Sequence, residues 1–435
     1  MTKLLAAQAE LTVVGDASQS IYRWRGADYR NMTKLKSDFP NLTEIRLDRN
    51  YRSTQIILDA ATQVIGHNKN HPILSLWTDK GAGEKINLIE AYSGSDEANR
   101  IVEEIAKYHA SGREYSEIAL LYRTNAQSRA IEEAFIRNGI PYVLVGGTKF
   151  YERKEIKDLL AYVRILLNPE DKVSYTRAEK AGKRRLAMIM ALREKVDLLT
   201  ARPAEILEMI LEASKYLEQF DEEVEEDLSR IENIRELQVV AEGFADLPAF
   251  LENVALVQSE YFQGEKNKNS EDKAKAVTLM TLHAAKGLEF PIVFLIGMEE
   301  GLFPHSRALM DLEEMEEERR LAYVGITRAK EKLYLSYAKQ RTVWGNTGFQ
   351  TKSRFIDEIP TELIQVVGQT STGTISTNPG TAVGQIKNKS EKDFWESHGA
   401  QFKTKKTGVR VDSLSDSTLD DFLSGNLSIE ELLNR

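Results

Sequence analysis

The chain has 435 residues, of which 42% are hydrophobic and 29% are charged, which is typical of a soluble globular protein of two or three domains. It contains no cysteine, which excludes a disulfide framework, a thiolate metal site and a cysteine nucleophile. A net charge of −9 disfavours a protein that coats nucleic acid, although a local groove on an acidic protein can still bind a single strand.

No apolar run in the sequence reaches the length of a membrane span. The first residues also lack the apolar core and cleavage site of a secretory signal. We therefore expect a cytoplasmic protein without a membrane partner.

The N-terminal part of the chain alternates between short apolar runs and amphipathic stretches. It predicts strands at residues 11–14 and 44–47 and helices at residues 29–37 and 53–64. Regular alternation follows, with strands predicted at residues 86–91, 118–122 and 142–145 and helices at residues 96–110, 126–137 and 154–167. Such an alternation indicates an α/β fold with a parallel sheet and helices on both faces.

The pattern changes between residues 170 and 275, where no convincing strand occurs and helical stretches are first basic and later acidic. Strands resume at residues 277–282, 291–296 and 332–337, and a helix is predicted at residues 313–326. A helical block between two halves of a βα pattern indicates an insertion. After residue 360 the chain becomes rich in Gly, Ser and Thr, which is typical of a flexible linker.

The stretch VVGDASQSIYRWRGAD, residues 13–28, carries the first candidate site. Gln19 follows a predicted strand and a Gly-Asp turn, where its amide could bind a phosphate or an attacking water; a helix cap is the alternative. Tyr22, Trp24 and Arg25 combine rings with a guanidinium group, which suits a single strand because a ring stacks on a base while the cation meets phosphate. The alternative is a core tryptophan with solvated arginines.

Three further candidate stretches are LDRNYRS (residues 47–53), VTLMTLHAAKGLE (277–289) and EEERRLAYVGITRA (316–329). In the second, an apolar strand breaks into His283, Gly287 and Glu289, and an open α/β sheet places its ligand site at such a strand end. Arg52 and Arg328 suit phosphate because a guanidinium group stays charged and binds in bidentate fashion. Taken singly, each of these residues also has a plain structural role as the alternative.

In this order the four stretches closely resemble the second half of a UvrD/PcrA/Rep-type superfamily 1 DNA helicase, over about residues 1–360. The resemblance implies a RecA-like parallel sheet with an inserted all-helical domain. It also implies an ATP-dependent 3′–5′ helicase that translocates on single-stranded DNA and opens a single-strand/duplex junction in repair or replication. The implied segments are a remnant of the first lobe (1–48), the first part of the second lobe (49–168), the helical insertion (169–275), the second part of that lobe (276–362), and a linker with a short helical tail (363–435).

The resemblance also implies roles for single residues. On the nucleotide side these are Gln19 as a γ-phosphate sensor, Tyr51 stacking on adenine, Arg52 and Arg328 on the γ-phosphate, Glu289 near the ribose and triphosphate, and Gly287 in the preceding turn. On the DNA side they are Trp24 stacking on a base, Tyr22 and Arg25 beside it, His283 coupling strand contact to the ATP state, and Arg123 and Asn125 on DNA phosphates.

Two elements of the family are absent from this sequence: the phosphate-binding G-x-x-x-x-G-K-S/T loop and the acidic D-E-x-x-Q element. The implied cofactors are ATP and Mg²⁺, with the metal ligands expected in a missing N-terminal lobe. We therefore predict no metal site here, no ATP hydrolysis by this chain alone and no small-molecule substrate beyond ATP. The insertion also lacks the duplex-contacting R-G-I-G stretch.

Two rival hypotheses remain open from the sequence. One is a stand-alone single-strand-binding module that works without ATP turnover. The other is the helicase arm of a helicase–nuclease, although no carboxylate-rich nuclease motif follows residue 360.

Overall fold

The computed structural model describes residues 11–69, 72, 74–198, 200–266, 275–343 and 346–367, and all structural statements concern these residues. The side chains of residues 24, 33, 36, 262–266, 342, 343, 346 and 347 are not described. The linker predicted from residue 363 is wrong at its start, because Ile364–Val367 form a strand that pairs with the sheet. The rest of the predicted linker and the helical tail, from residue 368 onward, lie outside the described residues.

The strands are β1 (Ile86–Ser93), β2 (Ile118–Tyr122), β3 (Tyr142–Val145), β4 (Val277–Thr281), β5 (Phe290–Leu295), β6 (Ala329–Val343), β7 (Asn346–Phe349) and β8 (Ile364–Val367). The helices outside the insertion are α2 (Arg30–Asp38), α3 (Gln55–Ile65), α4 (Gly94–Ala110), α5 (Ser128–Arg137), α13 (Leu312–Ile326) and α14 (Arg354–Asp357). The inserted block holds α6 (Lys154–Leu167), α7 (Lys172–Ala181), α8 (Lys183–Arg193), α9 (Pro203–Ser214), α10 (Glu225–Glu242) and α11 (Leu247–Lys266). Short 3₁₀ turns include η1 (Ala17–Gln19), η2 (Arg23–Arg25), η4 (Asn125–Gln127) and η7 (Ser306–Met310).

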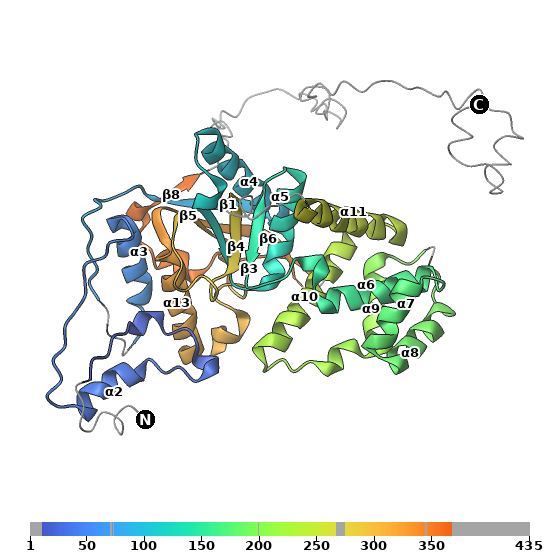
Figure 1. The fold of residues 1–435 in the computed structure, drawn as a ribbon, viewed down its shortest axis with the longest axis horizontal. Coiled ribbons are helices and arrows are strands. Elements are labelled where there is room, and N and C mark those ends of the chain that lie inside the picture. The colour runs from blue at the N-terminus through green and yellow to red at the C-terminus, as the bar shows by residue number, and fades with distance from the viewer. Residues whose placement is uncertain are drawn as a thin grey trace, which may run out of the picture. The chain divides into compact units, whose positions relative to one another are not determined.

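The strands form one sheet in the order β3-β4-β2-β5-β6-β1-β8. Figure 1 shows this sheet with its flanking helices. Every pair along this order is parallel, and β7 adds to β6 in the antiparallel direction. All five residues of β2 are buried, as expected of a parallel strand covered on both faces. The predicted α/β fold with a parallel sheet is therefore confirmed.

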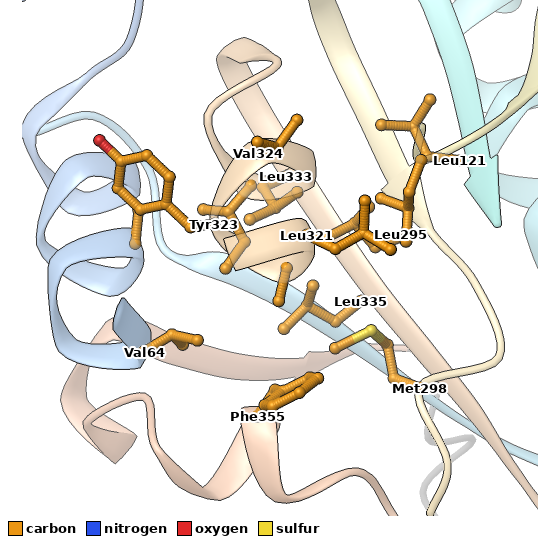
Figure 2. Close-up of a cluster of buried hydrophobic side chains, with 14 of the residues drawn as sticks. Val64, Leu121, Leu295, Met298, Leu321, Tyr323, Val324, Leu333, Leu335 and Phe355 are labelled. Atoms are coloured by element: carbon orange, nitrogen blue, oxygen red, sulfur yellow. The ribbon is translucent and has the colours of Figure 1, made fainter. Parts of the chain in front are cut away.

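Helices cover both faces of the sheet, and each face has its own apolar core. Ala119 and Leu121 of β2 pack with α3 and α13 in one core, part of which Figure 2 shows. Ile118 and Leu120 point the other way and pack with α4 and α5. This alternation along a strand is what the two-residue repeat of a pleated strand requires.

The inserted helices have a third apolar core, built from α6 to α11 with Phe150 and Tyr151. The sequence placed residues 154–167 in the preceding lobe and began the insertion at residue 169, but α6 packs into this third core. The chain enters this block after β3 and returns from it into β4, and these two strands are hydrogen-bonded neighbours in the sheet. The backbone nitrogen of Val277 donates to the carbonyl oxygen of Pro141 at 2.9 Å. An insertion between adjacent strands therefore leaves the sheet continuous.

Two predicted strands are wrong: residues 11–14 and 44–47 form no ladder with any described strand. Their apolar side chains are exposed, as Val14 and Ile45 show with 81% and 78% of their surface accessible. An apolar run becomes a strand only when neighbouring strands pair with it. The predicted helix at residues 126–137 also starts later, at Ser128, because Thr124 and Gln127 form a capping box around η4.

Candidate functional site

Three stretches far apart in the sequence meet at the amino edge of the sheet. Glu289 directly precedes β5, and Arg328 directly precedes β6. Arg52, from the turn before α3, donates through Nε to Glu289 Oε2 at 2.6 Å and through Nη1 to the carbonyl oxygen of Thr327 at 3.2 Å. We call Arg52, Glu289 and Arg328 the amino-edge cluster. The strand-end rule, which predicted one site at the carboxyl edge, missed this position.

The turn that carries Tyr51 and Arg52 is fixed by polar contacts to the sheet. Asn50 Oδ1 accepts from the backbone nitrogens of Arg52 and Ser53 at 2.8 and 2.9 Å. The buried hydroxyl of Ser53 donates to the carbonyl oxygen of Ala329 at 2.6 Å. These contacts tie the turn to the first residue of β6, and this explains why Arg52 reaches the cluster.

Arg328 is buried, with only 1% of its surface exposed, and hydrogen bonds to neighbouring residues hold its guanidinium group in place. Its Nε donates to the carbonyl oxygen of Val324 at 2.9 Å, Nη1 to that of Leu288 at 3.1 Å, and Nη2 to the hydroxyl of Thr327 at 3.1 Å. Burial lowers the pKa of Arg328 to about 10, and the charge of Arg52 adds to this effect. The group is thus charged at neutral pH while it donates to three neutral oxygens.

Helix α13 delivers Arg328 to this edge because it packs very closely on the sheet. A Cβ atom at Gly325 would lie 2.5 Å from Leu282 Cδ2 and 2.9 Å from Leu295 Cδ2. A larger residue at this position would displace the side chains of Leu282 and Leu295. Gly325 therefore permits the close approach of α13 to the sheet.

Glu289 is the carboxylate of the amino-edge cluster, and it is shared between cations. Its Oε1 lies 2.8 Å from Lys330 Nζ, and its Oε2 accepts from Arg52. Hydrogen bonds from Lys330 and then Arg52 lower the pKa of Glu289 to about 2. One carboxylate thus faces two cations with Arg328 close by, a charge balance that favours an added anion.

Two predicted nucleotide-side residues lie in or against the turn before Glu289. Gly287 has a φ of +90°, a left-handed conformation that glycine adopts readily. Gln19 donates from Nε2 to Asp16 Oδ2 at 2.8 Å, and its carbonyl oxygen accepts from Lys286 Nζ at 2.8 Å. The structure therefore brings Gln19 to the loop that leads into the amino-edge cluster.

A second group lies at the carboxyl edge of the sheet: Arg123 directly follows β2, Asn125 begins η4, and His283 follows β4. We call these three residues the carboxyl-edge group. Arg123 donates from Nε to Glu318 Oε1 at 2.9 Å, and its Nη1 lies 3.5 Å from Glu225 Oε1 of α10. Burial makes the largest single contribution to the pKa of Arg123 and lowers it. The charges of Glu318 and Glu225 act in the opposite direction, and the pKa is raised overall.

Asn125 also faces the insertion, since its Nδ2 donates to the hydroxyl of Ser229 on α10 at 3.3 Å. Its carbonyl oxygen accepts from Nη2 of the buried Arg153 at 3.1 Å. Arg123 and Asn125, predicted from the sequence as DNA contacts, are thus both joined to the inserted helices.

His283 lies against the aromatic-arginine stretch. The hydroxyl of Tyr22 donates to the carbonyl oxygen of His283 at 3.2 Å, and the two ring centroids are 6.2 Å apart. Burial, with the charge of Arg123, lowers the pKa of His283 to about 3, so its imidazole is neutral at pH 7. Arg25 is exposed in η2, and Trp24 lies in the same turn with its side chain outside the described atoms.

Sequence reasoning missed several residues of these sites. Lys330 and Glu318 are ion-pair partners of Glu289 and Arg123. Arg49 lies over the ring of Tyr51 and also over that of Trp77. The position of Lys330, two residues after a predicted phosphate-binding arginine, was a usable signal. Glu318 and Trp77 are far in sequence from the residues they serve, and no local sequence pattern indicates their roles.

No group of three or more His, Asp or Glu side chains in the described part of the chain is placed to hold a metal ion. Among the same residues, no helix combines the length and apolarity that crossing a membrane requires.

Fold and site together define a split α/β domain, with a helical insertion and an arginine cluster suited to an anion at one sheet edge. A family model described as the UvrD-like helicase C-terminal domain matches residues 45–226 and 187–340, and one described as the UvrD/REP helicase N-terminal domain matches residues 1–40. The chain belongs to the UvrD/PcrA-type helicase family.

Curated relatives agree with this assignment. The ATP-dependent DNA helicase PcrA of Bacillus subtilis is 45% identical over 404 residues, which are 82% of this chain and 54% of that protein. PcrA of Staphylococcus epidermidis is 41% identical over 418 residues, 84% of this chain and 56% of that protein. The chain thus spans about half the length of the curated relatives it matches. A solved C-terminal domain of a possible DNA helicase from Lactobacillus plantarum aligns at 13% identity and a TM-score of 0.33, covering 73% of this chain and 98% of that one.

Proposed function

We propose that this chain is the C-terminal part of a cytoplasmic, ATP-dependent 3′–5′ DNA helicase, which translocates on single-stranded DNA and unwinds duplex DNA in repair or replication. The family membership and the names of the relatives support the helicase activity. The polarity and the pathway follow from the resemblance of the motifs. The inserted helices form a separate domain in this proposal, and the duplex junction is the second DNA partner.

The amino-edge cluster is the observation that carries the nucleotide half of this proposal. Two arginines approach each other there, and the lowered pKa of Arg328 reflects burial together with the charge of Arg52. A γ-phosphate between them would relieve that repulsion and gain charge-assisted hydrogen bonds. Arg52 and Arg328 would then neutralise the charge that develops during phosphoryl transfer. Glu289 would release Arg52 toward the phosphate while Lys330 stays beside it.

Tyr51 and Gln19 complete the nucleotide side in this proposal. Tyr51 is 73% exposed and is adjacent in sequence to Arg52, so a base could stack on its ring while the triphosphate meets the cluster. Mg²⁺, when bound, would neutralise charge on the phosphates. The sequence carries no D-E-x-x-Q element, so we assign the metal ligands to a preceding lobe.

The DNA side would run over the loop that contains His283 and the aromatic-arginine stretch. The neutral imidazole of His283 suits a hydrogen bond or a ring contact rather than an ion pair with phosphate. Tyr22, Trp24 and Arg25 would supply stacking and a phosphate contact. We assign Asn125 to a DNA phosphate through its amide and give Arg123 the role of orienting that region.

We further propose that the partner this chain needs is an N-terminal helicase lobe with a phosphate-binding loop. The exposed apolar residues of segments 11–14 and 44–47 support this, because they suit strands of a sheet that such a lobe would complete. A chain without that lobe would not hydrolyse ATP.

The test is ATP turnover with and without single-stranded DNA. The purified chain should stay at background, and adding a lobe with the phosphate-binding loop, joined or in trans, should give DNA-stimulated turnover that Arg328→Ala abolishes. Turnover by the chain alone, abolished by Arg328→Ala, would refute the need for a partner lobe. Single-strand binding without any turnover in the rejoined protein would favour the binding-module hypothesis.

A further inference from the structure

Two side chains lie in series behind the exposed ring of Tyr51: Arg49 lies over that ring, and Trp77 lies against Arg49. We call Arg49 and Trp77 the stack. The guanidinium carbon of Arg49 lies 4.9 Å from the centroid of the Tyr51 ring and 5.4 Å from that of the Trp77 ring. Both distances are within the range of a cation–π interaction. Arg49 is thus placed between two aromatic rings from different parts of the chain.

The backbone shows why these side chains meet. Arg49 and Trp77 form a parallel β-bridge, with Asn50 N donating to Trp77 O at 2.7 Å and Trp77 N donating to Asp48 O at 3.0 Å. Neighbours across a bridge project their side chains to the same side. The pairing of the two main chains therefore places Arg49 next to Trp77.

The same segment, residues 76–82, holds the whole turn that carries Tyr51 and Arg52. The backbone nitrogens of Gln55 and Ile56 donate to the carbonyl oxygens of Gly81 and Ala82 at 3.0 and 2.9 Å. Lys80 Nζ donates to the carbonyl oxygen of Arg52 at 2.6 Å. We call residues 76–82 the brace.

Charge and exposure then decide what the stack can do. Asp79 of the brace forms an ion pair with Arg49, so the charge of the arginine behind the Tyr51 ring is balanced by a carboxylate. Tyr51 is still 73% exposed, so the side chains that back it leave most of the ring open to solvent. A ring supported on one face and open on the other is suited to accept a flat, uncharged aromatic group.

We propose that Arg49 and Trp77 are positioning residues that hold Tyr51 ready to stack on a purine base, and so favour adenine nucleotides over pyrimidine nucleotides. This inference rests on the proposed nucleotide-binding function and deepens it. Without the stack, Tyr51 would sample several rotamers, and binding would have to order it. Ordering one such side chain lowers affinity by about two- to tenfold. A purine loses more than a pyrimidine because its larger ring overlaps more of the tyrosine.

The experiment measures weak binding to the full chain by saturation-transfer NMR with ATP, CTP and tripolyphosphate as probes. The parent should bind ATP more tightly than CTP, with saturation reaching the adenine protons. Arg49→Ala and Trp77→Ala should each weaken ATP about two- to tenfold and bring it close to CTP, while tripolyphosphate binding stays unchanged. Trp77→Phe should restore the preference. Arg113→Ala, which removes another exposed ion-paired arginine, is the matched control and should change nothing.

The outcomes separate this inference from the function it rests on. An ATP-over-CTP preference that survives Arg49→Ala and Trp77→Ala, or a parent with no adenine signal, overturns the stack. An equal loss of tripolyphosphate binding in both variants also overturns it, because the residues would then support the turn as a whole. Tripolyphosphate binding that is indifferent to Arg52→Ala would instead overturn the amino-edge cluster as a phosphate site.

Coupling between Arg49 and Tyr51 gives an independent check. In a double-mutant cycle, Arg49→Ala should have little effect once Tyr51→Ala has removed the ring, since the arginine acts only through it. Additive losses of ATP affinity would contradict a positioning role and would indicate that Arg49 meets the nucleotide directly.

Discussion

The two edges of the sheet carry arginines in opposite electrostatic situations. At the amino edge, Arg328 donates to neutral oxygens, and Arg52 shares Glu289 with Lys330. At the carboxyl edge, Arg123 lies between Glu318 and Glu225 in a mostly buried ion-pair network. The first edge is left with positive charge that an anion can satisfy, and the second is already satisfied by the chain.

This difference separates two roles that a sequence cannot distinguish. A guanidinium group that binds phosphate should not already be neutralised by a carboxylate of the chain. One that joins two parts of the chain should be neutralised in this way. Arg123 connects β2 to helix α13 through Glu318 and to the insertion through Glu225. Its geometry therefore suits the placement of α10 beside the sheet better than a direct phosphate contact.

The largest expected effect tests the amino edge. In the chain joined to a complete first lobe, Arg52→Ala and Arg328→Ala should each lower ATP turnover by about 10³–10⁵-fold, because in the proposed function each charge would stabilise the transferred phosphoryl group. Steady-state ATPase measurements without DNA and with saturating single-stranded DNA check this. Asn125→Ala is the carboxyl-edge control and should keep DNA-independent turnover. Near-parental turnover in Arg52→Ala would remove this edge from the nucleotide site.

The next effect compares the two ion pairs as structural contacts. Glu318→Gln should destabilise the fold by about 3–5 kcal/mol, because it leaves the charge of Arg123 buried without its main partner. Glu289→Gln, in the more exposed pair with Arg52, should cost less than about 1 kcal/mol. Urea unfolding of both variants measures the difference. Equal losses of unfolding free energy in the two variants would mean that the ion pairs at the two edges contribute equally to stability.

A smaller effect concerns the single strand. Trp24→Ala should weaken single-strand binding by about 1–3 kcal/mol, and Trp24→Phe should recover most of it, because a flat ring remains to stack. Arg25→Ala should also weaken binding and flatten its salt dependence, since one phosphate contact is lost. Fluorescence anisotropy across a salt series, on the chain joined to a first lobe, is the measurement. A Trp24→Ala protein that melts early yet binds DNA normally would make Trp24 a core residue.

The smallest effect separates the edges by pH. The pKa of the His283 imidazole is about 3 in the folded chain, against an ordinary value of 6.5. As pH falls, the imidazole is therefore protonated first in the unfolded chain. Its contribution to stability is complete above pH 6.5 and is lost as pH falls toward 3. The pKa of Glu289 falls from 4.5 to about 2, so its contribution is lost only as pH falls below 4.5.

Urea unfolding at about pH 7 and about pH 5 therefore distinguishes the two residues. His283→Gln should lessen the loss of stability between these pH values, and Glu289→Gln should leave that loss unchanged. A parental pH dependence in His283→Gln would mean that the imidazole is not held in its neutral form.

The sequence by itself determined the bounds of several strands of the sheet and of the first inserted helix. Strand β2 at residues 118–122, strand β3 at 142–145 and helix α6 at 154–167 have the bounds that their apolar patterns predict. Buried parallel strands read as continuous apolar runs, and an amphipathic helix repeats its apolar residues with its own period. The motifs likewise named Arg52, Glu289 and Arg328 before any contact between them was visible.

Only the tertiary structure decided which of these residues meet and which edge they occupy. Arg52 and Glu289 are 237 positions apart, and Arg123 and Glu318 are 195 apart, so no local pattern links them. The failed strands at 11–14 and 44–47 show the same limit, because strand formation depends on a neighbour that local sequence does not specify. Whether an arginine is satisfied or available is a property of its surroundings, and folding alone brings those surroundings together.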